Sequence, residues 1–143
     1  MKNITFEKYQ GNGNDFVIID SRGNDLYKNY KTNKIFDIKK ICNRQFGVGA
    51  DGVIFIEEPN EDNYAKMIIF NSDGSEAQMC GNGIRCLVEY LHVNDSMNNK
   101  NIEYKIETKA GLKIAKYIND EITVKMGVPI LESQNIPTTI EKK

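Results

Sequence analysis

The chain of 143 residues has no tryptophan, one histidine, three prolines and three cysteines. It also lacks any apolar run near the roughly 18 residues of a membrane-spanning helix, and its first residues lack the apolar segment of a secretion signal. Three cysteines at irregular spacing, at positions 42, 80 and 86, do not make a disulfide framework. These absences predict a cytoplasmic protein with reduced thiols and no membrane partner.

The sequence also lacks an excess of charge of either sign. The net charge is −1, the pI is near 5.9, and no block of like charges stands out. A nucleic-acid-binding protein usually has a basic face, so the sequence argues against a nucleic-acid partner. The lone histidine, His92, and the lack of a C-x-x-C pair argue against a metal site.

What is present indicates one globular domain, because 40% of the residues are hydrophobic and the length suits a single core. The pattern of apolar residues predicts an α/β fold of the α+β type. We expect strands at 4–9, 16–19, 53–56 and 65–70, a return strand at 76–79, and a meander of strands at 102–108, 112–118 and 121–126. Helices are expected at 35–46 and 84–93, and residues 21–33 are expected to be turn-like. The domain is expected to span 1–127, with 128–143 as a linker or the start of another unit.

Residues 47–52 match the letter pattern G-x-G-x-x-G. A dinucleotide-binding fingerprint needs a strand before it and a helix after it, and here the expected order is reversed. The segment is either a glycine-rich reversal or a loop that borders a small-ligand pocket.

Cys80 is the strongest candidate for chemistry. It lies where the expected return strand meets the second expected helix, and Gly81 and Gly83 leave the backbone next to it accessible. The N–H groups of a helix N-terminus stabilise a thiolate, which is the reactive form of cysteine, and they also bind carboxylates or phosphates. Cys42 and Cys86 lie within helical patterns, so we interpret both as packing residues.

Three asparagines, Asn14, Asn71 and Asn82, each lie in a glycine-flanked loop next to a strand or helix end. Asparagine in such loops commonly serves turn geometry. Three of them near a thiol would also suit a polar pocket for a zwitterion, since amides donate and accept hydrogen bonds without adding charge.

Residues 11–17, 44–52 and 70–86 together resemble the diaminopimelate epimerase family, and residues 125–130 resemble the segment by which that family leaves its first domain. The resemblance implies a cofactor-independent epimerase that converts LL- to meso-diaminopimelate for lysine and peptidoglycan synthesis. It implies two similar domains, each with a mixed or antiparallel sheet wrapped around a central helix. The active site would lie in the cleft between them.

The resemblance also implies roles for individual residues. Cys80 would be one of two opposed thiols, of which one removes the α-proton and the other returns one on the opposite face. Asn14 and Asn71 would bind the amino-acid substrate, and the N–H groups of Gly81 and Asn82 would hold its α-carboxylate. Many family members carry glutamine where Gly52 stands, so that one contact is absent here.

Family members are about twice as long as this chain, and their second cysteine lies in the other half. We therefore expect the missing C-terminal domain to be the partner, and the chain alone to be inactive. Three alternatives remain: a ligand-binding domain without turnover, a homodimer that opposes two Cys80 thiols, and a related epimerase or racemase that acts on lanthionine, histidine or hydroxyproline.

Overall fold

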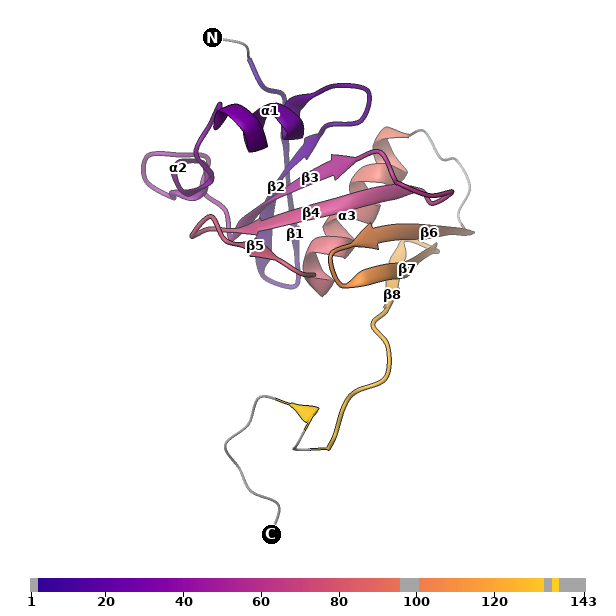
Figure 1. Ribbon diagram of the computed structural model, residues 1–143. Coiled ribbons are helices and arrows are strands. Elements are labelled where there is room, and N and C mark those ends of the chain that lie inside the picture. The colour runs from indigo at the N-terminus through magenta and orange to yellow at the C-terminus, as the bar shows by residue number, and fades with distance from the viewer. Residues whose placement is uncertain (1–2, 96–100, 133–134, 137–143) are drawn as a thin grey trace.

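The computed structural model describes residues 3–95, 101–132 and 135–136. Within this part the chain forms a mixed sheet of eight strands with three helices (Figure 1). The strands are β1 (Glu7–Gly11), β2 (Asn14–Asp20), β3 (Gly52–Glu57), β4 (Ala65–Asn71), β5 (Glu76–Ala77), β6 (Asn101–Thr108), β7 (Gly111–Ile118) and β8 (Glu121–Lys125). The helices are α1 (Leu26–Asn33), α2 (Ile38–Cys42) and α3 (Gly81–Asn94).

The strand order is β1-β2-β3-β4-β6-β7-β8, and the short β5 pairs with β4. Two neighbouring pairs are parallel, β2 with β3 and β4 with β6, and the other pairs are antiparallel. Parallel neighbours need a crossover connection. Helices α1 and α2 lie in the first crossover and α3 lies in the second, so the topology brings the N-terminus of α3 back to the sheet.

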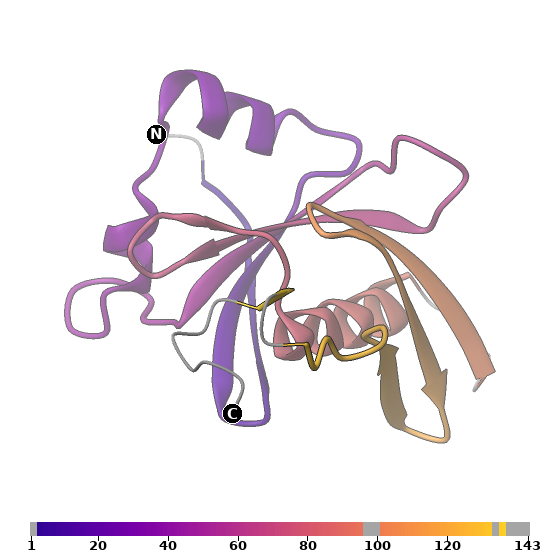
Figure 2. The ribbon, with the colours of Figure 1, turned by 60° about the horizontal axis from the view of Figure 1, so that its bottom comes forward.

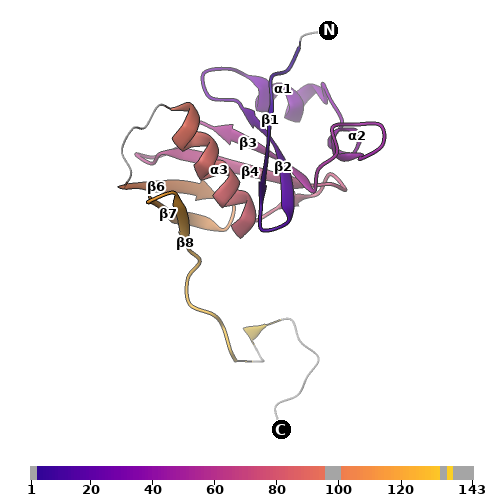
Figure 3. The same ribbon diagram turned by 180° about the vertical axis from the view of Figure 1, so that it is seen from behind.

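The sheet curls around α3. This helix contacts β1 and β2 near one end of the sheet and β7 and β8 near the other, with β3 and β4 between them. Figures 2 and 3 show α3 in the hollow of the curled sheet. Its apolar stripe, Ile84, Leu87, Val88 and Leu91, is fully buried against the sheet. The expectation of an α+β fold with a sheet wrapped around a central helix is confirmed.

The other face of the sheet is covered by α1 and α2. Alternate residues of β2 enter different cores: Phe16 and Ile18 face α3, whereas Val17 and Ile19 face α1 and α2. Strands β3 and β4 are buried on both faces in the same way. Burial on both faces explains why these strands have continuous apolar runs rather than alternating ones.

The expected strands at 16–19, 53–56, 65–70 and in the C-terminal meander are confirmed, as is the helix at 84–93. The return strand at 76–79 is confirmed only as the two residues of β5. The first strand lies later than expected, at residues 7–11. Asn12 and Gly13 both have positive φ and form a two-residue hairpin turn, which extends β1 up to the turn.

The expectation for residues 21–33 was wrong, because residues 26–33 form α1. The Asp25 side chain does not cap this helix; Ser21 Oγ accepts a hydrogen bond from the Tyr27 N–H, and the Tyr27 and Tyr30 rings pack against Phe55. Tertiary packing therefore stabilises a helix that its polar sequence does not indicate.

The expected helix at 35–46 was also wrong in its length, since α2 covers only residues 38–42. The carbonyls of Ile41 and Cys42 accept hydrogen bonds from the N–H groups of Gly49 and Ala50, where the loop folds back on the helix. Because these two carbonyls bond the returning loop instead of N–H groups of a further helical turn, α2 ends at Cys42.

After β8 ends at Lys125, residues 126–132 continue without helix or strand. The Met126 side chain still lies beside Gly81, and the following residues lead away from the body of the domain (Figure 1). Val128 and Leu131 on this segment are 91% and 83% exposed. No helix in the described residues is both long and apolar enough to span a bilayer.

Candidate active site

Cys80 is the N-cap residue of α3. Its backbone is extended, with φ −141° and ψ 120°, and its Sγ accepts a hydrogen bond from the Gly83 N–H at 3.4 Å. The side chain is half-buried. An N–H donor and the positive end of a 14-residue helix both lie at this sulfur.

Gly81 and Asn82 are the first two residues of α3. Backbone N–H groups in the first turn of an α-helix have no acceptor within the helix. They are therefore oriented to bind an anion beside Cys80. Gly83 packs closely: a Cβ there would lie 3.1 Å from Ile69 Cδ1 and 3.3 Å from Cys80 Cβ, which explains why the third position of this turn is glycine.

Asn14, at the start of β2, lies beside this helix N-terminus. The Asn82 Nδ2 donates a hydrogen bond of 2.8 Å to Asn14 Oδ1, although 68 residues separate the two. Asn82 Oδ1 in turn accepts from Arg85 Nη1 at 3.1 Å and from Asn12 Nδ2 at 3.3 Å. The structure therefore brings two of the predicted asparagines into direct contact next to Cys80.

Asp51 connects Asn14 to the glycine-rich loop. Its Oδ2 accepts hydrogen bonds from Asn14 Nδ2 at 3.0 Å and from the Asp15 N–H at 3.1 Å, and its Oδ1 accepts from Arg44 Nη2 at 2.9 Å. The hydrogen bond from Asn14 is the main reason that the pKa of Asp51 lies below its usual value. The segment 47–52 therefore contacts Asn14 through Asp51, and its role beside a small-ligand pocket stays a prediction.

Asp15, the neighbour of Asn14 in sequence, binds Arg44 as Asp51 does. Its carboxylate accepts two hydrogen bonds from Arg44, of 2.7 and 3.0 Å, and forms an ion pair with Lys8 at 3.0 Å. The Arg44 guanidinium, followed by Lys8, holds the pKa of Asp15 well below its ordinary value. Both acids are thus ionised at neutral pH.

Asn71 lies at the same edge of the sheet but in a different setting. It pairs with Gly52 at the end of β4, and its exposed side chain donates from Nδ2 to Ser75 Oγ at 2.9 Å, within its own turn. That turn reaches the site through the backbone, since the Ser72 N–H donates to the Asp51 carbonyl at 3.1 Å.

The other two cysteines are packing residues, as expected. Cys42 is 5% exposed and lies among the side chains between the sheet and α1–α2. Cys86 is on α3, is 2% exposed and belongs to the core between this helix and the sheet. Burial raises the pKa of both thiols, that of Cys86 to about 11. Cys80 is therefore the one half-exposed thiol in the chain.

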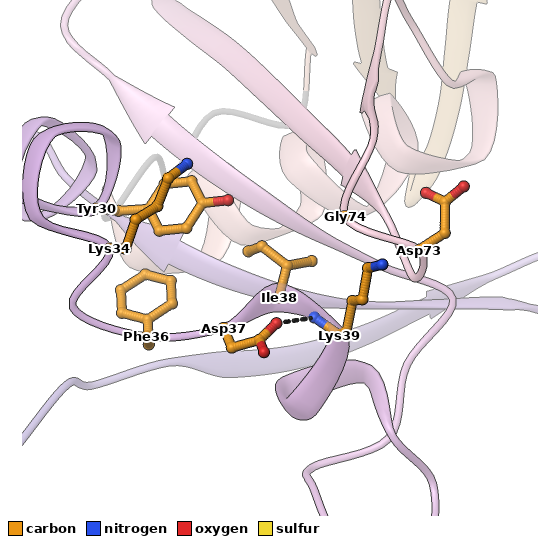
Figure 4. Close-up of a pocket in the computed structure, with 8 residues that line it drawn as sticks. All are labelled: Tyr30, Lys34, Phe36, Asp37, Ile38, Lys39, Asp73 and Gly74. Carbon is orange, nitrogen blue, oxygen red and sulfur yellow. Dashed lines mark hydrogen bonds between the residues drawn. The ribbon is translucent and has the colours of Figure 1, made fainter.

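A pocket of about 440 Å³ lies elsewhere, where α1 and α2 meet the β4–β5 turn (Figure 4). It is lined by Tyr30, Lys34, Phe36, Asp37, Ile38, Lys39, Asp73 and Gly74. Its carboxylates already bond neighbouring backbone, Asp37 to the Lys39 N–H and Asp73 to the Ser75 N–H. The chemistry-bearing residues lie at Cys80 instead, and the described residues contain no cluster of His, Cys, Asp and Glu suited to a metal ion.

The arrangement can hold a carboxylate at the start of α3 with a thiol at its side and amide groups facing it. The sequence singled out Cys80, Asn14, Asn71, Gly81 and Asn82 as candidates, and the structure places all of these except the Asn71 side chain together at the start of α3. The sequence did not single out Asp51 and Arg85, which bond Asn14 and Asn82. Nothing in the local sequence connects Asp51 to Asn14. Arg85 follows Asn82 by three residues, the spacing of neighbours on a helix surface, and this was a usable signal.

Comparison with known proteins identifies the family of this chain. The family model described as diaminopimelate epimerase matches residues 6–132. The diaminopimelate epimerase of Prochlorococcus marinus (strain NATL2A) is 53% identical over 98% of this chain and 49% of its own length. The chain thus spans about half the length of the curated relatives it matches, and it corresponds to their N-terminal half.

Solved structures show the same fold at low sequence identity. A probable proline racemase from Agrobacterium radiobacter K84 superposes with a TM-score of 0.60 at 17% identity, over 80% of this chain and 37% of that one. A Bacillus anthracis phenazine biosynthesis protein of the PhzF family gives 0.58 at 23% identity, over 87% of this chain and 40% of that one. With the family model matching most of its residues, this chain belongs to the diaminopimelate epimerase family.

Proposed function

We propose that this chain supplies one half of the active site of a cofactor-independent diaminopimelate epimerase. In this proposal Cys80 is the thiol that faces one side of the substrate α-carbon. The N–H groups of Gly81 and Asn82 bind the α-carboxylate, and Asn14 and Asn71 bind other polar groups of the amino acid. The observation that carries the proposal is the position of Cys80 as the N-cap of α3, directly before two N–H groups without helical acceptors.

The chemistry follows from that position. The Cys80 thiolate takes the α-proton, which leaves the C–H electron pair on the α-carbon and delocalised into the carboxylate. Donors fixed at that carboxylate stabilise the developing charge without reorganisation. A thiol on the opposite face then gives a proton to the α-carbon and becomes a thiolate. The reaction moves protons only, and no electron acceptor is required.

Inversion needs an acid and a base on opposite faces of the carbon. Cys42 and Cys86 are buried and lie in the same domain as Cys80, so neither can face the substrate from the other side. We therefore propose that the opposing thiol belongs to a second, C-terminal domain, that the first domain ends near residue 127, and that this chain alone does not epimerise. The three free thiols suit the reducing cytoplasm, where we place the protein.

The test is incubation of the chain with LL-diaminopimelate in deuterated water. We expect no meso product by chiral chromatography, and any deuterium at the α-carbon to depend on Cys80. Exchange without inversion indicates a one-base half-site. Racemisation by the chain alone would favour the homodimer with two opposed Cys80 thiols.

The matched variants are Cys80→Ala and Cys42→Ala. Cys80→Ala removes the exposed thiol and should abolish exchange, whereas Cys42→Ala removes a buried thiol on the opposite face of the sheet and should leave exchange intact. Equal exchange in both variants contradicts the role given to Cys80. Saturable binding without exchange, in the intact chain, would instead indicate a ligand-binding domain, and repeating the assay with lanthionine, histidine and hydroxyproline tests the alternative substrates.

A further inference from the structure

Five side chains form a continuous chain of hydrogen bonds along the site. It runs from Arg44 through Asp51, Asn14 and Asn82 to Arg85, with successive distances of 2.9, 3.0, 2.8 and 3.1 Å. We infer that Asp51 and Arg85 are positioning residues, which together fix the orientation of the Asn14 and Asn82 amides beside Cys80. This inference rests on the proposed function for its ligand but not for its geometry.

The direction of the chain follows from its two charged ends. A carboxylate only accepts hydrogen bonds, so Asp51 requires the Nδ2 of Asn14 to face it. A guanidinium only donates, so Arg85 requires the Oδ1 of Asn82. Asn14 then offers its Oδ1 to the middle of the chain and Asn82 offers its Nδ2. The bond between the two amides can form in this one direction only.

An asparagine amide is nearly symmetric in shape, and its oxygen and nitrogen ends exchange when the group turns by half a rotation. Without charged ends, Asn14 and Asn82 could reverse together and keep the bond between them. Asp51 and Arg85 remove that second state. Each asparagine keeps one side-chain N–H that this chain of hydrogen bonds does not use. Asn82 Oδ1 already accepts hydrogen bonds from Arg85 and Asn12. The pair is thereby set to donate to a carboxylate.

The end residues are themselves held in place. Asp51 also accepts from the Asp15 N–H, and its own N–H donates to the Asp15 carbonyl at 2.9 Å, so the backbones of β2 and the 47–52 loop are joined there. Arg85 lies on α3, one turn after Asn82, and its Nη1 comes within 3.9 Å of where a Cβ on Gly81 would stand. The Arg85 cation therefore lies beside the backbone that we assign to the α-carboxylate.

The experiment compares side-chain amide resonances in ¹H–¹⁵N spectra of the ligand-free chain. The variants are Asp51→Asn and Arg85→Met, each of which removes one charged end. Asp15→Asn is the matched control for Asp51, because the Asp15 side chain accepts from the same Arg44 and from the Asp51 N–H but forms no hydrogen bond with the side chain of either asparagine. Arg85→Lys keeps a donor-only cation and serves as the conservative rescue.

We expect Asp51→Asn and Arg85→Met to shift the Asn14 and Asn82 amide resonances and to speed their exchange with water by tenfold or more. Asp15→Asn should leave the Asn82 resonances in place, and Arg85→Lys should restore part of the protection lost in Arg85→Met. Unchanged amide resonances in both Asp51→Asn and Arg85→Met would overturn the inference. Backbone spectra show whether each variant folds. If Asp51→Asn does not fold, the Arg85 variants decide whether the inference stands, because Arg85 occupies a half-exposed helix position.

A titration with LL-diaminopimelate adds the functional readout. Loss of one oriented donor should weaken binding about tenfold in each of the two variants and not in Asp15→Asn. Affinity that stays unchanged while the amides reorient contradicts the positioning role for this ligand. If the unmodified chain binds no diaminopimelate, the half of the active site that it supplies does not bind this ligand alone, and the amide resonances still decide whether Asp51 and Arg85 orient the asparagines.

Discussion

The guanidinium of Arg22 and the carboxylate of Asp95 meet in two parallel hydrogen bonds, Nη1 to Oδ2 and Nη2 to Oδ1, each 2.8 Å long. Asp95 is the C-cap residue of α3, and Arg22 follows β2, so the pair ties the end of the central helix to the sheet. Charge-assisted, two-pronged pairs of this kind are among the stronger hydrogen bonds in proteins. The Tyr64 hydroxyl also donates to Asp95 Oδ2, at 3.0 Å.

Asp95→Asn should therefore lower the free energy of unfolding by about 2 kcal/mol, as measured by urea denaturation at pH 7. The Arg22 hydrogen bond lowers the pKa of Asp95. The contribution of Asp95 to stability is therefore complete above its pKa in the unfolded chain, about 3.9. It is lost as the pH falls through the lower pKa of the folded chain. Asp25→Asn is the control, since Asp25 forms an exposed pair with Lys28 at 3.8 Å and should change stability by less than about 0.5 kcal/mol.

Glu107 on β6 anchors the loop between β3 and β4. Its carboxylate accepts hydrogen bonds from the N–H groups of Asn60 and Glu61 and from the Nδ2 groups of Asn60 and Asn63, all between 2.8 and 3.0 Å. These donors lower the pKa of Glu107 to about 2, the Asn63 side chain being the largest cause. The anchor is therefore complete above pH 4.5 and is lost as the pH falls through about 2.

Glu107→Gln should speed hydrogen exchange of the Asn60 and Glu61 amides at neutral pH, because the uncharged side chain accepts through one oxygen instead of two. Glu103→Gln on the same strand removes only a surface ion pair with Lys116 and should leave those amides protected. Equal exchange in the two variants would show that the loop is ordered without Glu107.

Parts of the fold were predictable because the signal lies within one element. The stripe of Ile84, Leu87, Val88 and Leu91 on α3 repeats at helical spacing, and the continuous apolar runs of β3 and β4 report burial on both faces. Helix α1 carries no such signal, because its stability comes from rings that meet Phe55 of a later strand. The same limit applies to the site. Cys80 is evident from its neighbours in sequence, whereas the bond from Asn14 to Asp51 joins residues 37 positions apart.

The three thiols should differ sharply in reactivity. Cys42 and Cys86 are buried, and burial raises the pKa of each, so at pH 7.5 both remain protonated and shielded. Iodoacetamide under native conditions should therefore modify Cys80 at least tenfold faster than either, as read by peptide mass spectrometry. In urea all three should react at similar rates. Early labelling of Cys86 in the folded chain would contradict the packing of α3.

Substitution of Tyr30 tests how α1, the helix that the sequence did not indicate, is stabilised. Its ring lies 5.0 Å from Phe36, 5.5 Å from Phe55 and 5.4 Å from Phe70, so it joins α1 to the sheet, and it lies on the wall of the pocket in Figure 4. Tyr30→Ala should lower the free energy of unfolding by about 3 kcal/mol, since it empties a buried aromatic site. Tyr30→Phe keeps the ring and should cost less than about 1 kcal/mol. Denaturant midpoints of the two variants give the comparison.

The backbone at Gly52 leaves no room for a side chain. A Cβ at this position would lie 2.5 Å from the Phe70 carbonyl oxygen of the paired strand, and that atom belongs to the backbone and cannot turn away. Gly52→Gln should therefore not add a substrate contact, and Gly52→Ala should already destabilise the chain by about 2 kcal/mol in thermal or urea unfolding. Gly81→Ala is the control for stability, because its Cβ would meet no atom closer than 3.5 Å. If Gly52→Ala proves as stable as Gly81→Ala, β3 and β4 can separate locally at Gly52, and a glutamine there would become compatible with this chain.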